Sequence, residues 1–149
     1  FHAWVEGRFG QQVMLDPDDL PGRADSGIDG DDDLEELIRT FEAGPFAERR
    51  PLQVEPAFAL VLGGQVVRGR IDAVYDAGEG RYLLVDWKTG RHLEPEPLQL
   101  AIYRVAWAEL HGVPLEQVRA AFFHVRTGEL VEPPDLPGRA ALERLLTTG

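Results

Sequence analysis

An acidic and a basic residue stand at the end of an apolar segment, "RYLLVDWKTG". Side chains along a strand alternate between its two faces, so Asp86 and Lys88 point one way and Trp87 points the other. Asp72 follows the preceding apolar segment, "QVVRGRI", where packing alone gives an acid no role. If the two segments pair as strands, the carboxylates of Asp72 and Asp86 converge near Lys88.

Two converging carboxylates in a half-buried site repel each other unless a cation neutralises them. Hard oxygen ligands of this kind select Mg²⁺ or Mn²⁺. Lys88, two residues after Asp86, can hold a water molecule or a developing oxyanion. Together these groups suit metal-assisted hydrolysis of a phosphodiester. The alternative interpretation of Asp86 and Lys88 is a surface salt bridge with no chemical role.

A helix predicted over residues 98–110 adds two polar groups. Gln99 and Tyr103 are four residues apart and therefore share one face of this otherwise apolar helix. Such a pair could clamp a phosphate or a base. The alternative is a half-buried Tyr whose hydroxyl is in contact with solvent, which is common in proteins.

The elements that must position these residues follow from hydrophobic periodicity. Apolar spacing predicts helices over 1–9, 34–41, 98–110 and 135–146, and strands over 53–62, 65–75, 81–88 and 118–126. Gly63-Gly64 joins the first two strands as a hairpin. The strand–helix–strand order after residue 81 favours a mixed sheet with helices packed on it, which is an α/β fold.

Charge and composition narrow the class of protein. The 149 residues suffice for one domain, and the net charge of −11 argues against nucleic-acid binding at first sight. However, residues 16–36 hold ten acidic side chains and one basic side chain, whereas the rest of the chain holds sixteen acidic and fourteen basic side chains. We therefore predict a single domain over 1–149 with an acidic loop at 11–33. The absence of cysteine fits a reducing cytoplasm, and no segment resembles a membrane span.

Several short motifs in one order resemble a known family. "GRIDAV", "VDWKTG" and "QLAIY" resemble the nuclease module of RecB-type enzymes in the PD-(D/E)xK superfamily, and "FHAWVE" and "QVEPAF" match its further positions. The resemblance implies a restriction-endonuclease-like fold, in which helices flank a mixed central sheet. It also implies a role for each matched residue: metal ligation by His2, Asp72, Asp86 and the Trp87 carbonyl, water positioning by Lys88, DNA-backbone contacts by Gln99 and Tyr103, and support of the site by Glu55.

The resemblance also implies a wider function. Such modules form the C-terminal part of bacterial ATP-dependent helicase–nucleases that resect double-strand breaks for recombinational repair. It therefore predicts an exonuclease-type deoxyribonuclease in a larger cytoplasmic protein, with Mg²⁺ or Mn²⁺, single-stranded DNA ends fed by a helicase, and a second subunit. Some relatives hold an iron–sulfur cluster through cysteines, which this chain lacks. It also lacks a phosphate-binding G-x-x-x-x-G-K-[ST] loop, so we predict no ATPase here.

Two other functional classes remain open at this stage. The first is a non-catalytic DNA-binding or scaffolding module, since some nuclease folds lose their acids. The presence of Asp72, Asp86 and Lys88 argues against an inactivated copy. The second is a hydrolase of small phosphate esters, which would cleave a nucleotide but not polymeric DNA.

Overall fold

Five strands form the central sheet of the computed structural model, in the order β1-β4-β5-β6-β7. The structure describes residues 1–8, 31–90 and 96–147. Strands β5 and β6 are parallel, and the other neighbouring strands are antiparallel. The predicted mixed α/β sheet is therefore confirmed. Its strands are β1 (Gln53–Val54), β4 (Ala73–Gly78), β5 (Arg81–Lys88), β6 (Val118–His124) and β7 (Glu129–Val131).

A helical crossover makes the parallel pair possible. Helix α3 (Pro97–His111) and the short 3₁₀ helix η3 (Leu115–Gln117) lead from β5 to β6. Pro97 begins α3, where its missing N–H costs nothing. Gly112 ends the helix with a φ of 63°, a left-handed conformation that glycine adopts without strain. The helix predicted over 98–110 is confirmed.

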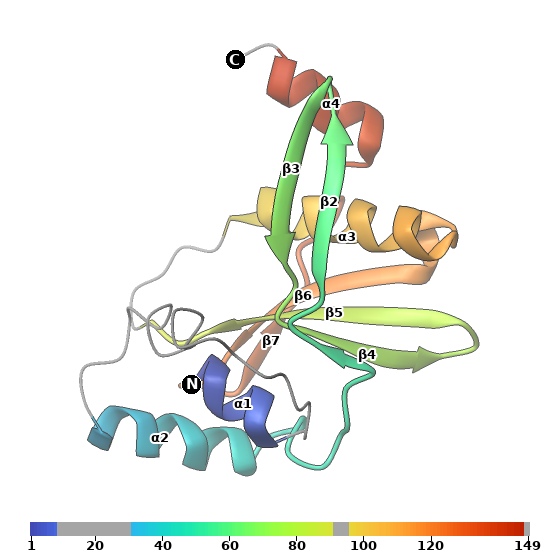
Figure 1. Ribbon diagram of the computed structural model, residues 1–149. Helices are drawn as coiled ribbons and strands as arrows, with labels where there is room; N and C mark the ends of the chain where they lie inside the picture. Colours follow the sequence, from blue (N-terminus) through green and yellow to red (C-terminus); the bar gives the residue numbers. More distant parts are fainter. Residues whose placement is uncertain (9–30, 91–95, 148–149) are drawn as a thin grey trace.

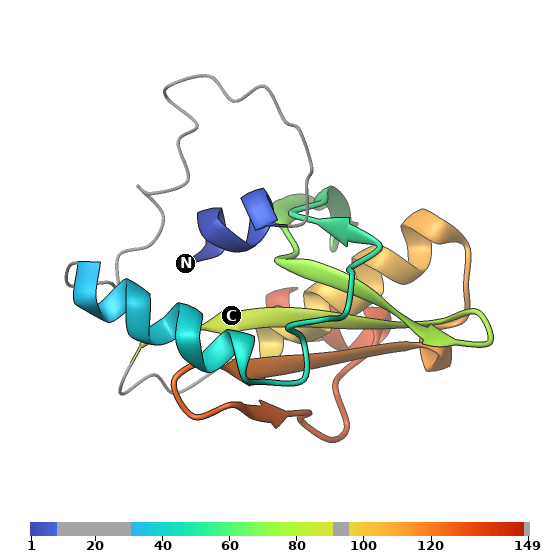
Figure 2. The ribbon, with the colours of Figure 1, turned by 90° about the horizontal axis from the view of Figure 1, so that it is seen from below.

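Helices cover both faces of the sheet, which makes two apolar cores (Figures 1 and 2). Helix α3 and α4 (Arg139–Thr147) lie on one face, packed with a separate hairpin of β2 (Ala57–Leu62) and β3 (Gln65–Arg70). Helices α1 (His2–Arg8) and α2 (Asp31–Glu42) lie on the other, against an aromatic cluster that includes Trp87. Sheet residues alternate between these cores, so the two faces carry different chemistry.

The strands predicted as continuous over 53–62 and 65–75 are each broken, and this part of the prediction is wrong. Val54 pairs with Ala73 in the central sheet, and Ala57 pairs with Arg70 in the hairpin, so the same register continues across the break. The two paired segments bend together at residues 55–56 and 71–72. Pro56 lies in this bend, and it has no N–H to donate to the hydrogen-bond ladder between strands. The bend lifts the hairpin off the sheet towards α4, as Figure 1 shows.

Other boundaries also differ from the sequence prediction. Helix α2 begins at Asp31, within the predicted acidic loop, and the remainder of that loop lies outside the described residues. Helix α4 begins at Arg139 rather than at residue 135, after Pro137 and Gly138. Strand β6 ends at His124 rather than at 126, and β7 was not predicted. No helix in the described ranges is long and apolar enough to cross a membrane.

Candidate active site

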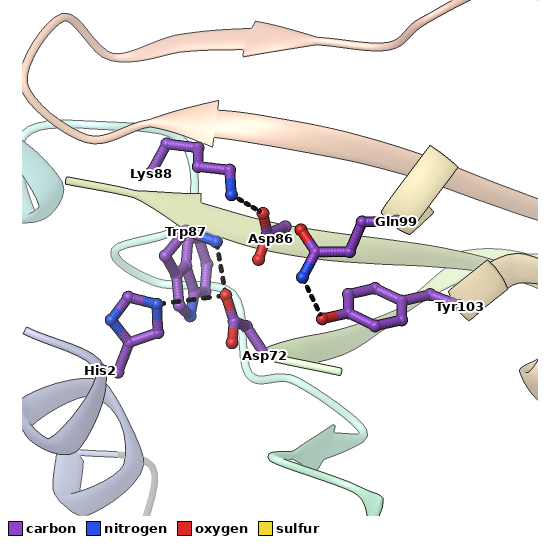
Figure 3. Close-up of polar contacts among 7 residues, drawn as sticks. All are labelled: His2, Asp72, Asp86, Trp87, Lys88, Gln99 and Tyr103. Carbon is purple, nitrogen blue, oxygen red and sulfur yellow. Dashed lines mark hydrogen bonds and ion pairs between the residues drawn. The ribbon is translucent and has the colours of Figure 1, made fainter. Parts of the chain in front are cut away.

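The ends of β4 and β5 bring the two predicted carboxylates together. Ala73 pairs with Val85, so the next step of the same antiparallel register places Asp72 opposite Asp86. Both residues are buried, with 9% of Asp72 and 5% of Asp86 exposed. Asp72 immediately follows the bend, and Asp86 precedes the last residues of β5. The predicted convergence of these acids therefore arises directly from strand pairing (Figure 3).

Asp72 is held as an anion by two neighbours. Its Oδ2 atom accepts a hydrogen bond from the backbone N–H of Trp87 at 2.8 Å and lies 3.2 Å from Nε2 of His2 (Figure 3). Burial by itself would raise the pKa of Asp72. The contacts with His2, together with hydrogen bonding to Asp86 and the Trp87 N–H, outweigh burial and lower this pKa. His2 thus reaches the site from the opposite side of the sheet, as the first residue of α1.

Asp86 has the opposite electrostatic character. Burial and the adjacent Asp72 raise its pKa from 3.8 to about 7, although Lys88 acts in the other direction. Lys88 Nζ lies 2.7 Å from Asp86 Oδ2, and it also lies 5.3 Å from the ring centre of Phe122. Asp86 Oδ2 is fully buried, and the Lys88 ammonium is the positive charge beside it. The metal-free pair therefore carries one carboxylate that favours a proton or a cation.

Gln99 and Tyr103 share one face of α3, as their spacing predicted, and this face is turned towards the carboxylates (Figure 3). Gln99 Nε2 donates a hydrogen bond to the Tyr103 hydroxyl oxygen at 2.8 Å (Figure 3). Burial raises the pKa of Tyr103, and the negative charges of Asp86 and Asp72 raise it further. The hydroxyl therefore stays protonated at neutral pH. Because the oxygen accepts from Gln99, the hydroxyl proton is not used in that hydrogen bond and is available for donation.

Glu55 occupies a strained position at the bend. Its φ of 57° is uncommon for a residue other than glycine and costs about 1–2 kcal/mol. Its N–H donates to the Asp72 carbonyl at 3.0 Å, so it fixes the backbone beside the first carboxylate. Its charge also contributes, as the last of several causes, to the raised pKa of Tyr103. Strain of this kind is concentrated at functional sites.

The two carboxylates fit a hard divalent cation. Asp86 Oδ2 is a buried oxygen with unused acceptor capacity, and it lies beside the anionic Asp72. No group of three or more metal-binding side chains is arranged as a metal site within residues 1–8, 31–90 and 96–147. Mg²⁺ commonly binds through one or two carboxylates and keeps several waters, so Asp72 and Asp86 are enough protein ligands for this ion. Ligation by His2 and by the Trp87 carbonyl remains a prediction.

A pocket beside these residues was not anticipated from the sequence. It has a volume of about 550 Å³ and lies between the β2–β3 hairpin and α3. Lys88, Gln99 and Tyr103 form one side of it, and Phe58 and Gly69 of the hairpin form another. The available signal was Gly69, because a glycine inside a strand often marks a close approach of another group.

A mixed sheet that brings two carboxylates and a lysine together at adjacent strand ends is the arrangement expected of metal-dependent nucleases. The family model of the PD-(D/E)XK nuclease superfamily matches residues 4–147, and the chain belongs to this superfamily. Membership implies phosphodiester cleavage, DNA as a ligand and, in general, a divalent metal such as Mg²⁺. The matched range includes every candidate side chain except His2.

Comparison with other known proteins adds little to this assignment. A search of curated proteins finds no match. Among solved structures, the chain is similar to that described as "Crystal structure of SSO0001", with 23% sequence identity and a TM-score of 0.36. The alignment covers 77% of this chain and 55% of that one, so the chain spans little more than half of its length.

Proposed function

We propose that the chain is a Mg²⁺- or Mn²⁺-dependent deoxyribonuclease module of the RecB type, acting on DNA ends. The observation that carries this proposal is the pair of buried carboxylates, Asp72 and Asp86, opposite each other at the ends of paired strands. Lys88 lies within 2.7 Å of the second carboxylate, which adds a cation at the same point. A structural salt bridge would not account for a second buried acid.

Each residue has a distinct task in this proposal. Asp72 and Asp86 would hold the divalent cation, with His2 and the Trp87 carbonyl as further ligands. When bound, the cation would neutralise the carboxylates and polarise a phosphoryl oxygen. Lys88 would hold the attacking water, whose oxygen bonds to phosphorus while the bond to one sugar oxygen breaks and that oxygen takes up a proton.

Substrate positioning falls to α3 and to the bend. The Tyr103 hydroxyl and the Gln99 amide are hydrogen-bonded to each other and are both neutral, so they would bind the phosphates of the strand without adding charge. Glu55 would support the site through its hydrogen bond to the Asp72 carbonyl. Binding energy used in this way orients the phosphate for attack.

The resemblance of "FHAWV", "VVRGRIDAV" and "VDWKTG" to the C-terminal nuclease module of actinobacterial AdnB supports a more specific role. We infer that the chain works in a cytoplasmic, ATP-dependent helicase–nuclease that resects double-strand breaks during recombinational repair. A helicase motor and a second subunit would deliver single-stranded ends to it as an exonuclease. The net charge of −11 supports this dependence, because an acidic module binds DNA weakly without help.

The test is cleavage of end-labelled single- and double-stranded DNA, and of a small phosphate ester, with Mg²⁺ or Mn²⁺. We expect cleavage of DNA but not of the ester, and we expect Asp86→Ala and Asp72→Ala to abolish it. Asp76→Ala is the matched control, since Asp76 is an exposed acid on β4 away from the site. DNA binding without cleavage would indicate a scaffolding module instead, and full activity in Asp86→Ala would overturn the assignment.

A further inference from the structure

We propose that the pocket between the β2–β3 hairpin and α3 receives one unpaired nucleobase of the strand being cleaved. This inference rests on the proposed nuclease function and names a binding subsite for it. The pocket volume of about 550 Å³ lies within the range of small-ligand sites. Lys88, Gln99 and Tyr103 line the pocket and also lie beside the carboxylates, so the pocket is adjacent to the place where a phosphate would be cleaved.

The chemistry of the walls suits a flat, largely apolar group. Phe58 and Val67 of the hairpin form one wall, and Leu98 and Ile102 of α3 form the facing wall. Nucleobases bind to single-strand-specific proteins through contacts of their faces with apolar and aromatic side chains. A phosphate would instead require a cationic interior, and the cations here are confined to Arg68 and Lys88.

Arg68 supplies a contact for the backbone of the same strand. It lies in β3 at the pocket, is exposed, and forms no hydrogen bond or ion pair with any residue in the described ranges. Arginine contacts to phosphate give affinity without reading sequence. One carboxylate, that of Glu96, also lines the pocket, and it can accept a hydrogen bond from an exocyclic amino group of a base.

The hairpin wall is formed before any substrate binds. Gly69 pairs with Phe58 across the hairpin, and a Cβ atom at position 69 would lie only 2.8 Å from the Phe58 ring. The glycine therefore leaves room for this ring against the neighbouring strand. The same ring packs edge-on against Tyr103, with centroids 5.5 Å apart. At the hairpin tip, the Gly63 N–H donates to Glu143 of α4 at 2.9 Å.

In this proposal, a base that lies between the hairpin and α3 has left its pair and its stack in a duplex. The pocket is sized for one small ligand and is bounded by the hairpin on one side and a helix on the other. The substrate class that follows is a single strand, or a duplex end opened by at least one nucleotide. Unpairing a base costs energy, so intact duplex would be cleaved more slowly than single strands.

The experiment compares two single-stranded oligonucleotides, of which one carries a single abasic residue in its middle. Cleavage rates at each bond are measured with Mn²⁺ on denaturing gels. We expect the bond whose base would occupy the pocket to be cleaved at least about fivefold more slowly at the abasic residue, which is the lower end of what base stacking contributes. This measurement needs no variant and is therefore independent of any folding defect.

A pair of variants tests the location. Ile102→Trp should fill the pocket, slow cleavage of the normal strand at least about fivefold, and remove the difference between the two strands. Leu110→Trp is the control, because Leu110 is on the same helix but 63% exposed and outside the pocket. Equal cleavage of both strands by the unmodified protein would overturn the base subsite alone. No cleavage of either strand would contradict the proposed function itself.

Discussion

The Asp72 carboxylate accepts a hydrogen bond from the backbone N–H of Trp87, 2.8 Å away, at the point where the β4–β5 ladder has ended. The last backbone pair of β4 and β5 is Ala73 with Val85, and beyond it the Asp72 side chain takes the place of a backbone acceptor for the Trp87 N–H. Trp87 lies between Asp86 and Lys88, so this contact fixes the spacing of the two acids. The two contacts of His2 do most to lower the pKa of Asp72 against the effect of burial, and the Trp87 N–H adds to them, whereas burial and the neighbouring Asp72 raise the pKa of Asp86.

The Asp86 carboxyl group should make the metal-free protein less stable as pH rises. Its pKa in the fold is about 7, above the ordinary 3.8, so between these values the folded state keeps a proton that the unfolded chain has released. The free energy of unfolding therefore falls across this interval. We expect Asp86→Asn to raise that free energy, by about 2 kcal/mol more at pH 8 than at pH 5.

Urea denaturation in a chelating buffer at both pH values measures this difference. Asp76→Asn provides the control, since Asp76 is an exposed acid on β4, away from the two buried carboxylates. A stabilisation by Asp86→Asn that is equal at pH 5 and pH 8 would show that the carboxylate pair does not repel as proposed.

Lys88 should act on rate rather than on metal binding. Its Nζ lies 2.7 Å from Asp86 Oδ2, and its side chain is 19% exposed, so the ammonium group is fixed beside the carboxylates. Removing one preorganised donor typically costs about a hundred- to a thousandfold in turnover. We expect that loss in Lys88→Ala, and no rescue in Lys88→Arg, because a planar guanidinium does not replace a compact ammonium.

The measurements are single-turnover cleavage and Mn²⁺ affinity by calorimetry, on the same preparations. Affinity should be retained in both Lys88 variants because the carboxylates remain. If Mn²⁺ binding is lost together with cleavage, Lys88 organises the metal ligands and does not hold the water.

Local patterns were sufficient to predict the strand that carries the site. The alternation in "RYLLVDWK" placed Asp86 and Lys88 on one face and Trp87 on the other, and the structure has Trp87 in the opposite core. The cap at Gly112 fixed the end of α3, and the i, i+4 spacing paired Gln99 with Tyr103. Each of these features depends on residues close together in the chain.

Three other features, which depend on partners far apart in the chain or across a hairpin, were not predicted. The bend at Glu55 and Pro56 requires two strands to leave the sheet together, and neither strand shows this in its own periodicity. The contact of Phe58 with Gly69 follows from pairing across the hairpin, so Gly69 was visible but its neighbour was not. From the sequence, Asp33 was assigned to the predicted acidic loop. In the structure its side chain pairs with Arg126, 93 residues away.

The ion pair between Asp33 and Arg126 should contribute strongly to stability. Two hydrogen bonds of 2.7 and 2.6 Å join them, and Arg126 also donates to the carbonyl of Thr89, next to Lys88. Their side chains are only 9% and 13% exposed, so Asp33→Ala removes two short, charge-assisted hydrogen bonds from a buried guanidinium. We expect a loss of about 3 kcal/mol in the free energy of unfolding.

The exposed pair of Arg119 and Glu132 is the matched control. It has the same two-bond geometry, at 2.9 and 2.7 Å, but both side chains are at least 40% exposed. Glu132→Ala should cost about 1 kcal/mol or less. Similar costs for Asp33→Ala and Glu132→Ala in chemical denaturation would show that burial does not strengthen the first pair.

Gly69 should be required for the shape of the pocket wall and not for the flexibility of β3. A methyl group at this position would meet the Phe58 ring at 2.8 Å, and the ring would have to move against Tyr103. We expect Gly69→Ala to lower the free energy of unfolding by about 1–3 kcal/mol and to slow cleavage. The cost should shrink in a Phe58→Leu background, because the smaller side chain leaves room.

Gly7→Ala is the opposite control: nothing lies within 4 Å of a Cβ there, and alanine should stabilise α1 by about 0.5–1 kcal/mol. A double-mutant cycle by urea denaturation measures the coupling. Additive costs for Gly69→Ala and Phe58→Leu would show that the two residues do not form one wall.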